Sequence, residues 1–309
     1  MDTSVFEQIA SSLTVKSICS PLSPDVPASI TIADLDEYLD PGSDPNLDPW
    51  NNPSRVIDND GDVVGMLWYG NYAGEEDEAT IDEVMEHVAP YEYLSSATTI
   101  LDAVDLFGTK RNEYFYVTHV NEIVGVLRYS DLLHPLGRLA FLALALEIED
   151  QALRLCQSVS INEKCWLSLP DNRKHKAIEL FKLRYGREPK LKDDARKRWT
   201  DIFLLGRNIS DIGLLIECTN LVDKATMIWK QKLITVATRA DVLGFFKTLR
   251  IIRDRCAHPG GEEALIPKER LAHFVNSAKS MRSSLRESMQ THGVGSRKER
   301  IIIRVPPEV

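Results

Sequence analysis

The N-terminal half of this chain contains one short pattern twice. Residues 55–71 and 114–133 each predict a strand, a tight turn and a second strand. Each copy also predicts an opening helix-like phrase and a helix before its strands, at residues 13–18 and 32–39 in the first copy and at 81–85 and 99–107 in the second. An internal repeat of about 60–70 residues predicts two copies of one small αβ module.

The acidic run that begins at Asp58 lies between the two strands of the first copy. A calcium-binding EF-hand loop needs Gly at its sixth position and Glu at its twelfth. Counted from Asp58, those positions hold Val63 and Tyr69, so we expect a hairpin turn instead.

With this repeat, residues 1–135, and 10–135 most clearly, resemble a tandem pair of CBS domains, with copies at about 10–74 and 80–135. The resemblance implies a regulatory ligand, an adenine nucleotide or a related molecule, between the paired copies. Members of the family often hold ribose and phosphate with a Gly, a hydroxyl residue three positions on and an Asp three beyond that. Gly125, Arg128 and Asp131 occupy these places in the second copy, so Asp131 is expected to accept from ribose hydroxyls and Arg128 to meet phosphate.

The first copy departs further from the family pattern. The equivalent positions hold Gly65, Trp68 and Asn71, and a Pro/Asp/Asn-rich insert covers residues 40–53. We expect this first site to be empty of ligand. The alternative for the whole tandem is a pure dimerisation module.

The C-terminal half predicts helices at helical apolar spacing from residue 136 onward. After a first helix at 139–153, they are expected at 171–185, 192–205, 210–217, 220–236, 241–257 and 267–289. A strand pattern is seen only at 301–305, in the tail 291–309. We therefore predict an α+β chain, with an αβ module at 1–135 and an all-α bundle at 136–290.

One motif in the helical half contains residue types that are common in catalytic sites. Arg253, Asp254 and His258 lie at the end of an apolar helix, just before Pro259. The alternative interpretation is that these residues simply lie at a solvent-exposed helix end. The pattern resembles the signature of HEPN domains, which are helical bundles, although their usual residue at the place of Asp254 is Asn. The resemblance covers about residues 136–290, with only 253–258 being specific.

The HEPN resemblance implies a metal-independent endoribonuclease. His258 would act on the 2′-hydroxyl or on the leaving 5′-oxygen, Arg253 would stabilise the phosphorane-like charge, and Asp254 would orient the histidine or a partner chain. The expected protein is a ligand-sensing homodimer of the toxin or antiviral-defence type that needs no cofactor. The rival is a non-catalytic nucleotide-binding scaffold that binds RNA or a partner, such as a nucleotidyltransferase antitoxin.

Charge divides the chain in the same way. Residues 1–135 hold 5 basic and 25 acidic residues, whereas residues 136–309 hold 32 and 21, within a total net charge of −9. A basic half suits a polyanion such as RNA, although mutual attraction of the halves or plain solvation explains it equally well. The candidate RNA contacts are Lys174, Lys182, Arg184 and Arg187.

Five scattered cysteines without a C-x-x-C pair favour reduced thiols and argue against a zinc site. The start of the chain does not have the pattern of a signal peptide. The longest apolar run, residues 139–146, is too short to span a bilayer. We therefore expect a cytoplasmic protein with no metal and no membrane partner.

Overall fold

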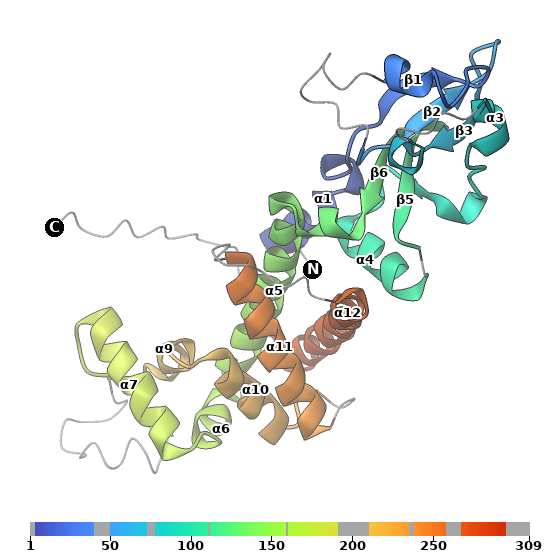
Figure 1. The fold of residues 1–309 in the computed structure, drawn as a ribbon. Coiled ribbons are helices and arrows are strands. Elements are labelled where there is room, and N and C mark those ends of the chain that lie inside the picture. The colour runs from blue at the N-terminus through green and yellow to red at the C-terminus, as the bar shows by residue number, and fades with distance from the viewer. Residues whose placement is uncertain are drawn as a thin grey trace. The chain divides into compact units, whose positions relative to one another are not determined.

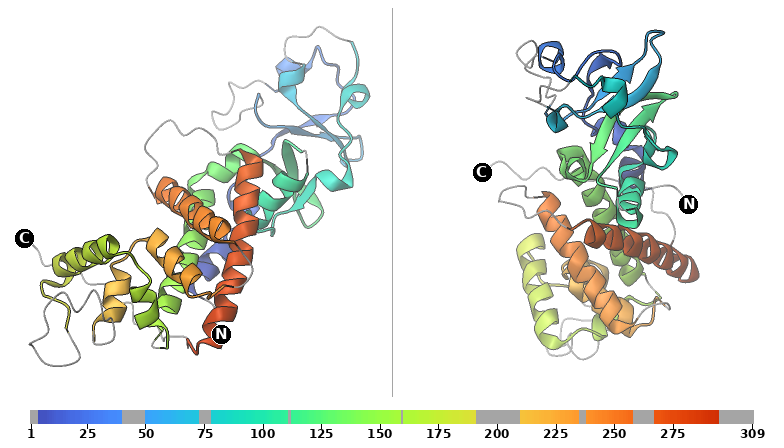
Figure 2. Two further views of the ribbon diagram at one scale, coloured as in Figure 1. Left: turned by 90° about the horizontal axis from the view of Figure 1, so that it is seen from below. Right: turned by 45° about the vertical axis from the view of Figure 1, so that its right-hand side comes forward.

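The computed structural model describes residues 4–39, 50–72, 78–110, 112–158, 160–190, 210–234, 238–257 and 267–294. The chain divides into two compact units (Figures 1 and 2). The αβ unit comprises Gln8–Ala143 and His258–Asn276, and the helical unit comprises Met1–Glu7, Leu144–Ala257 and Ser277–Val309. The divisions fall inside helices α1 (Val5–Ser12), α5 (Pro135–Gln157) and α12 (Lys268–Thr291).

The first copy in the αβ unit forms a three-stranded sheet in the order β1-β2-β3. β1 (Ser23–Pro27) runs parallel to β2 (Ser54–Ile57), which runs antiparallel to β3 (Val63–Leu67). Three short elements accompany the sheet: α2 (Leu35–Tyr38), η2 (Tyr69–Asn71) and α3 (Ile81–Val84). Apolar side chains of these elements and of residues next to α2 form its core, namely Val26, Ile32, Leu35, Leu39, Val56, Leu67, Tyr69 and Ile81.

The turn between β2 and β3 confirms the hairpin predicted at Asp58. The Asp58 carboxylate accepts from the backbone N–H groups of Asp60 and Asp62, both at 2.9 Å. Gly61 has a φ of 85°, which a residue without Cβ adopts at little cost. The acidic run is therefore used to close a turn.

The second copy repeats this arrangement. β4 (Tyr93–Ser95) runs parallel to β5 (Tyr114–His119), and β5 runs antiparallel to β6 (Glu122–Arg128). β5 and β6 are labelled in Figure 1. Val120 and Asn121 join β5 and β6 with φ values of 49° and 70°, the left-handed pair of a tight hairpin. The associated helices are η1 (Val15–Ser17), η3 (Pro90–Glu92), α4 (Ile100–Thr109) and η4 (Tyr129–Leu133).

The two copies exchange their opening segments. Ser20, which precedes the first sheet, bridges Val126 of the second sheet, and Glu86, which precedes the second sheet, bridges Met66 of the first. A Cβ on Gly125 would lie 2.6 Å from the Ser20 carbonyl oxygen, and a Cβ on Gly65 would lie 2.5 Å from a methionine Sδ. Glycine at these two equivalent positions therefore admits the exchanged segments, which join the copies into one unit.

The start of α12 packs against the second copy. A Cβ on Gly108, near the end of α4, would lie 2.1 Å from the Cβ of Ala272 on α12. Ala272 is itself buried. The close approach of these two helices therefore depends on a residue without a side chain at position 108.

The described residues of the helical unit form helices that pack pairwise. α10 packs on α11, α6 packs on α9 and α10, and α7 packs on α9. Asn220 begins α10 by accepting from the Asp223 N–H at 2.8 Å, and Gly186 ends α7 with a φ of 64°. The bounds are α6 Asn162–Leu167, α7 Asp171–Tyr185, α9 Ile212–Glu217, α10 Leu221–Lys230 and α11 Arg239–Ala257.

The predicted α+β class is confirmed, and most of the expected helices appear within a few residues of their predicted ends. The helix expected at 220–236 is shorter, because Lys232 adopts a φ of 52°. The Leu233 N–H then reaches back to the Ile228 carbonyl at 3.0 Å, which closes the helix in a Schellman turn. The helix predicted at 192–205 and the tail strand at 301–305 lie outside the described residues, and the domain limits at 135 and 290 remain predictions.

Candidate functional site

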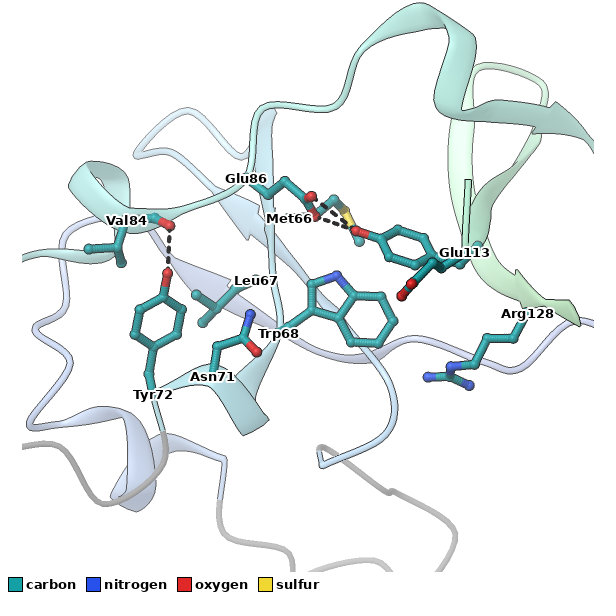
Figure 3. A pocket seen from close by; sticks show the side chains of 10 residues that line it. Met66, Leu67, Trp68, Asn71, Tyr72, Val84, Glu86, Glu113 and Arg128 are labelled. Atoms are coloured by element: carbon teal, nitrogen blue, oxygen red, sulfur yellow. Dashed lines mark hydrogen bonds between the residues drawn. The ribbon is translucent and has the colours of Figure 1, made fainter. Parts of the chain in front are cut away.

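A cavity with a volume of about 650 Å³ lies in the αβ unit and draws its walls from both copies. This volume is in the range of small-molecule sites. The first copy contributes the end of β3 and the residues after it, and the second contributes the start of β5 and the end of β6 (Figure 3). The lining residues are Met66, Leu67, Trp68, Asn71, Tyr72, Val84, Glu86, Glu113, Tyr114 and Arg128.

Trp68 is the aromatic centre of this cavity. It follows the last residue of β3, where the chain leaves the sheet for η2, and its indole points into the space in Figure 3. The indole Nε1–H donates to the hydroxyl of Tyr116 at 3.1 Å. Its ring centroid lies 4.9 Å from that of Tyr114, with the planes tilted by 56°. Trp68 is therefore held at its polar edge while ring surface faces the cavity.

The carboxylate of Glu86 accepts hydrogen bonds from two tyrosine hydroxyls next to the indole of Trp68. Tyr116 donates to its Oε2 at 2.7 Å, and Tyr114 donates to its two carboxylate oxygens at 3.0 and 2.9 Å. Burial, with the neighbouring carboxylate, raises the pKa of both Tyr114 and Tyr116, so both remain donors at physiological pH. The Glu86 carboxylate is thus satisfied from within the wall.

Arg128 supplies positive charge at the opposite end of the indole. Its guanidinium carbon lies 5.3 Å from the Trp68 ring centroid, and its Nη1 donates a long bond of 3.4 Å to Ser20. Its Nη2 is buried without a hydrogen-bond partner among the described residues. A buried donor of this kind gains free energy from an incoming acceptor.

The other two residues predicted to bind ligand in the second copy are not part of the cavity wall. Asp131 accepts from the backbone N–H of Arg128 at 2.7 Å, which starts η4. Burial raises the pKa of Asp131, while the hydrogen bond from Arg128 opposes this. Gly125 is covered by Ser20 and Cys19. The structure thus brings Arg128 together with Trp68 and Asn71, the positions at which sequence reasoning expected an empty site.

No sequence signal pointed to Glu86 or Glu113. Glu86 belongs to the exchanged segment, and Glu113 lies one residue before β5. Tyr114 pairs with Arg128 in the sheet register, which places Glu113 beside the arginine's strand end. Both residues reach the cavity through pairing between segments, which a single-sequence pattern does not encode.

The predicted catalytic arginine lies on α11 in the helical unit. Arg253 donates from Nη1 to Glu149 of α5 at 2.6 Å and from Nη2 to Asp254 at 2.9 Å. Burial lowers the pKa of Arg253, but the two carboxylates more than offset this and raise it. The side chain stays 29% exposed. His258 lies outside the described residues.

The candidate RNA contacts on and after α7 are engaged by carboxylates. Lys174 is buried, and its Nζ lies 3.2 Å from Oδ1 of Asp171. Its neighbours on the surface are paired in the same way: Lys182 with Glu179 and Glu188, Arg184 with Glu217, and Arg187 with Asp211. These pairs reduce the net positive charge that this surface presents.

Within the described ranges, no group of three or more His, Cys, Asp or Glu side chains is placed to hold a metal ion. Nor does any helix in that part of the chain combine the length and apolar character needed to cross a bilayer.

Neither the protein-family models nor the curated proteins include a match to this chain. Solved structures similar to part of this chain include CBS-domain proteins. One, the CBS domains of a transcriptional regulator from Streptococcus pneumoniae, is 20% identical, covers 39% of this chain and 97% of its own, and has a TM-score of 0.29. A conserved CBS domain protein from Thermoplasma acidophilum is 19% identical, covers 42% of this chain and 75% of its own, and has a TM-score of 0.29. The CBS pair domain of a putative Mg²⁺ transporter from Shewanella oneidensis MR-1 is 15% identical, covers 40% of this chain and 71% of its own, and has a TM-score of 0.28.

Proposed function

We propose that the αβ unit is a CBS-like, ligand-sensing regulatory module that binds an adenine nucleotide or a related ligand in the cavity around Trp68. One observation carries this proposal: the cavity is lined both by the half-buried indole of Trp68 from one copy and by Arg128 from the other, and Nη2 of Arg128 has no hydrogen-bond partner among the described residues. An aromatic surface stacks on a base, and a guanidinium binds phosphate. Asn71 adds an amide that could donate to or accept from a base edge.

The same geometry offers a route from binding to regulation. Trp68 and Arg128 belong to different copies, so a ligand that contacts both favours one arrangement of the pair over others. A ligand shifts an equilibrium by its difference in affinity for the two states. The bound ligand would therefore stabilise one relative arrangement of the two copies.

Isothermal titration of the full chain with adenine nucleotides tests the proposal. We expect saturable binding that falls by about tenfold or more in Arg128→Gln, because a charge-assisted bond is lost. Lys16→Gln is the matched control, since Lys16 is exposed in the same unit and does not line the cavity. Binding of no nucleotide, or equal loss in both variants, would contradict this function.

We propose as a second function that the chain is a HEPN-like, metal-independent ribonuclease that uses the sequence motif Arg253, Asp254 and His258. The favouring observation is that Arg253 is held by Glu149 from a neighbouring helix yet keeps part of its side chain exposed. A fixed, accessible guanidinium suits stabilisation of a charged phosphodiester transition state. In this proposal a homodimer brings two such sites together, and RNA follows the basic side chains near α7.

RNA cleavage in EDTA by the wild-type chain tests this second function. We expect products with 2′,3′-cyclic phosphate and 5′-hydroxyl ends, and loss of cleavage in His258→Ala and Arg253→Ala but not in Arg250→Ala, an exposed arginine on the same helix. Absence of cleavage with and without nucleotides would leave the rival function, a scaffold that binds RNA or a partner protein such as a nucleotidyltransferase antitoxin.

A further inference from the structure

We propose that Glu113 makes the cavity selective for nucleoside monophosphates over nucleoside triphosphates. This inference rests on the nucleotide-binding function proposed above and deepens it. It starts from the charges that the cavity wall presents. Among the ten lining residues, Arg128 is the cation, while Glu86 and Glu113 are carboxylates. The wall therefore carries more negative than positive charge, which is unusual for a site that takes a polyanion.

The two carboxylates differ in what they leave for a ligand. Glu86 accepts from the hydroxyls of Tyr114 and Tyr116, and the Tyr114 hydroxyl lies within hydrogen-bond distance of both carboxylate oxygens, so these oxygens are already engaged. Glu113 is exposed and precedes β5. Its carboxylate lies toward the Trp68 and Arg128 end of the cavity in Figure 3. Glu113 is thus the carboxylate that faces the outer part of a bound ligand.

Arg128 can satisfy one phosphate group. Its buried Nη2 has no hydrogen-bond partner among the described residues, and the ring of Trp68 covers one face of the guanidinium. With a base stacked on Trp68, a phosphate attached directly to the ribose would meet Nη2. An unphosphorylated nucleoside would leave that donor without an acceptor, which costs binding free energy.

A second or third phosphate of the ligand would come close to a negatively charged carboxylate. A phosphomonoester carries about 1.5–2 negative charges at pH 7, and longer chains carry more. The strand register sets Tyr114 opposite Arg128, so the residue before Tyr114 lies at the same strand end as the arginine. A second or third phosphate that extends from Arg128 toward solvent therefore approaches the Glu113 carboxylate, and juxtaposed like charges oppose binding.

Titration calorimetry of the full chain with adenosine, AMP and ATP in Mg²⁺-free buffer tests this inference. We expect AMP to bind roughly tenfold or more tightly than either of the others. Glu113→Gln removes the charge at nearly constant shape, and we expect it to raise ATP affinity about three- to tenfold while changing AMP affinity less than about twofold. Glu122→Gln is the control, because Glu122 is an exposed carboxylate of the same unit outside the cavity wall, and it should leave the AMP-to-ATP ratio unchanged.

The outcomes separate this inference from the function on which it rests. If ATP binds as tightly as AMP, or if Glu113→Gln leaves the ratio unchanged, the selectivity role is wrong while nucleotide binding stands. If none of the three compounds binds, the nucleotide-binding function is wrong and the selectivity role falls with it.

Discussion

The indole Nε1–H of Trp68, a residue of the cavity wall, donates to the hydroxyl of Tyr116 at 3.1 Å and so connects the two copies of the αβ unit. Trp68 directly follows β3 of the first sheet, and Tyr116 lies in the middle of β5 and is fully buried. Tyr116 in turn donates to Glu86 of the exchanged segment at 2.7 Å. A ligand that moves the indole would therefore disturb a hydrogen-bonded chain across both copies.

Trp68→Ala is predicted to abolish most of the nucleotide affinity. Stacking of a base on an aromatic side chain contributes about 1–3 kcal/mol, so affinity should fall about 5- to 150-fold. Isothermal titration with AMP measures this change. Trp50→Ala is the control, because Trp50 is 55% exposed and does not line the cavity. An unchanged affinity in Trp68→Ala would show that the base binds elsewhere.

Asp131→Asn is predicted to preserve or raise thermal stability at neutral pH. Burial raises the pKa of Asp131 above 3.8, so the folded state holds this proton more tightly than the unfolded state does. The contribution of Asp131 is therefore most favourable at pH below 3.8 and is lost as pH rises through the raised pKa. Asparagine still offers an acceptor to the Arg128 N–H but carries no charge.

Thermal melts of both proteins between about pH 4 and pH 7 test this sign. The melting temperature of the variant should exceed or equal that of the wild type at neutral pH, and the difference should shrink toward acid. A difference that grows toward low pH would mean that the charged carboxylate stabilises the fold.

Gly108→Ala is predicted to destabilise the αβ unit by about 1–3 kcal/mol, because the new methyl group would overlap Ala272 on α12. Ala272→Gly in the same chain should recover part of this loss. Gly244→Ala is the matched substitution in α11, where nothing lies within 4 Å of the new Cβ. Alanine is favoured over glycine in a helix by about 1 kcal/mol, so that variant should be more stable than the wild type.

Urea unfolding of the three variants distinguishes packing from helix propensity. If Gly108→Ala stabilised the chain as Gly244→Ala is expected to do, the close approach of α4 and α12 would not exist in solution.

Glu149→Gln is predicted to lower the free energy of unfolding by less than about 1 kcal/mol, because both partners of the Glu149–Arg253 pair stay partly exposed and Arg253 keeps Asp254. If Arg253 takes part in RNA cleavage, the same variant should slow cleavage in EDTA by releasing the guanidinium. Glu179→Gln, which breaks a surface pair with Lys182 on α7, should leave cleavage unchanged. A loss of several kcal/mol in Glu149→Gln would instead make the pair a structural requirement.

The elements of the αβ unit were largely predictable because their signals are local. The Asp58 hairpin follows from turn-forming residues between two apolar runs, and Gly61 supplies the required positive φ. Helix ends follow local capping chemistry, as Thr99 shows by accepting from the Asp102 N–H at 3.2 Å. The end of α10 was missed because Lys232 adopts a left-handed conformation, which residue type alone rarely indicates.

The candidate site was only partly predictable. Arg128 was found because it occupies a position that the CBS resemblance marks. Trp68 and Asn71 were expected to border an empty site, yet they share one cavity with Arg128. Glu86 carried no signal, since its role depends on the hydroxyls of Tyr114 and Tyr116, which are about 30 residues away.

The sequence by itself determined the repeat, the hairpins and the helices, because turn chemistry and apolar periodicity act over a few neighbouring residues. Only the tertiary structure decided that the opening segments exchange between copies, with Ser20 beside Val126 and Glu86 beside Met66. That exchange sets Trp68 against Tyr116 and brings Arg128 to the same cavity. The physical reason is that strand pairing and side-chain packing over long separations depend on which surfaces bury each other, and no local pattern records that choice.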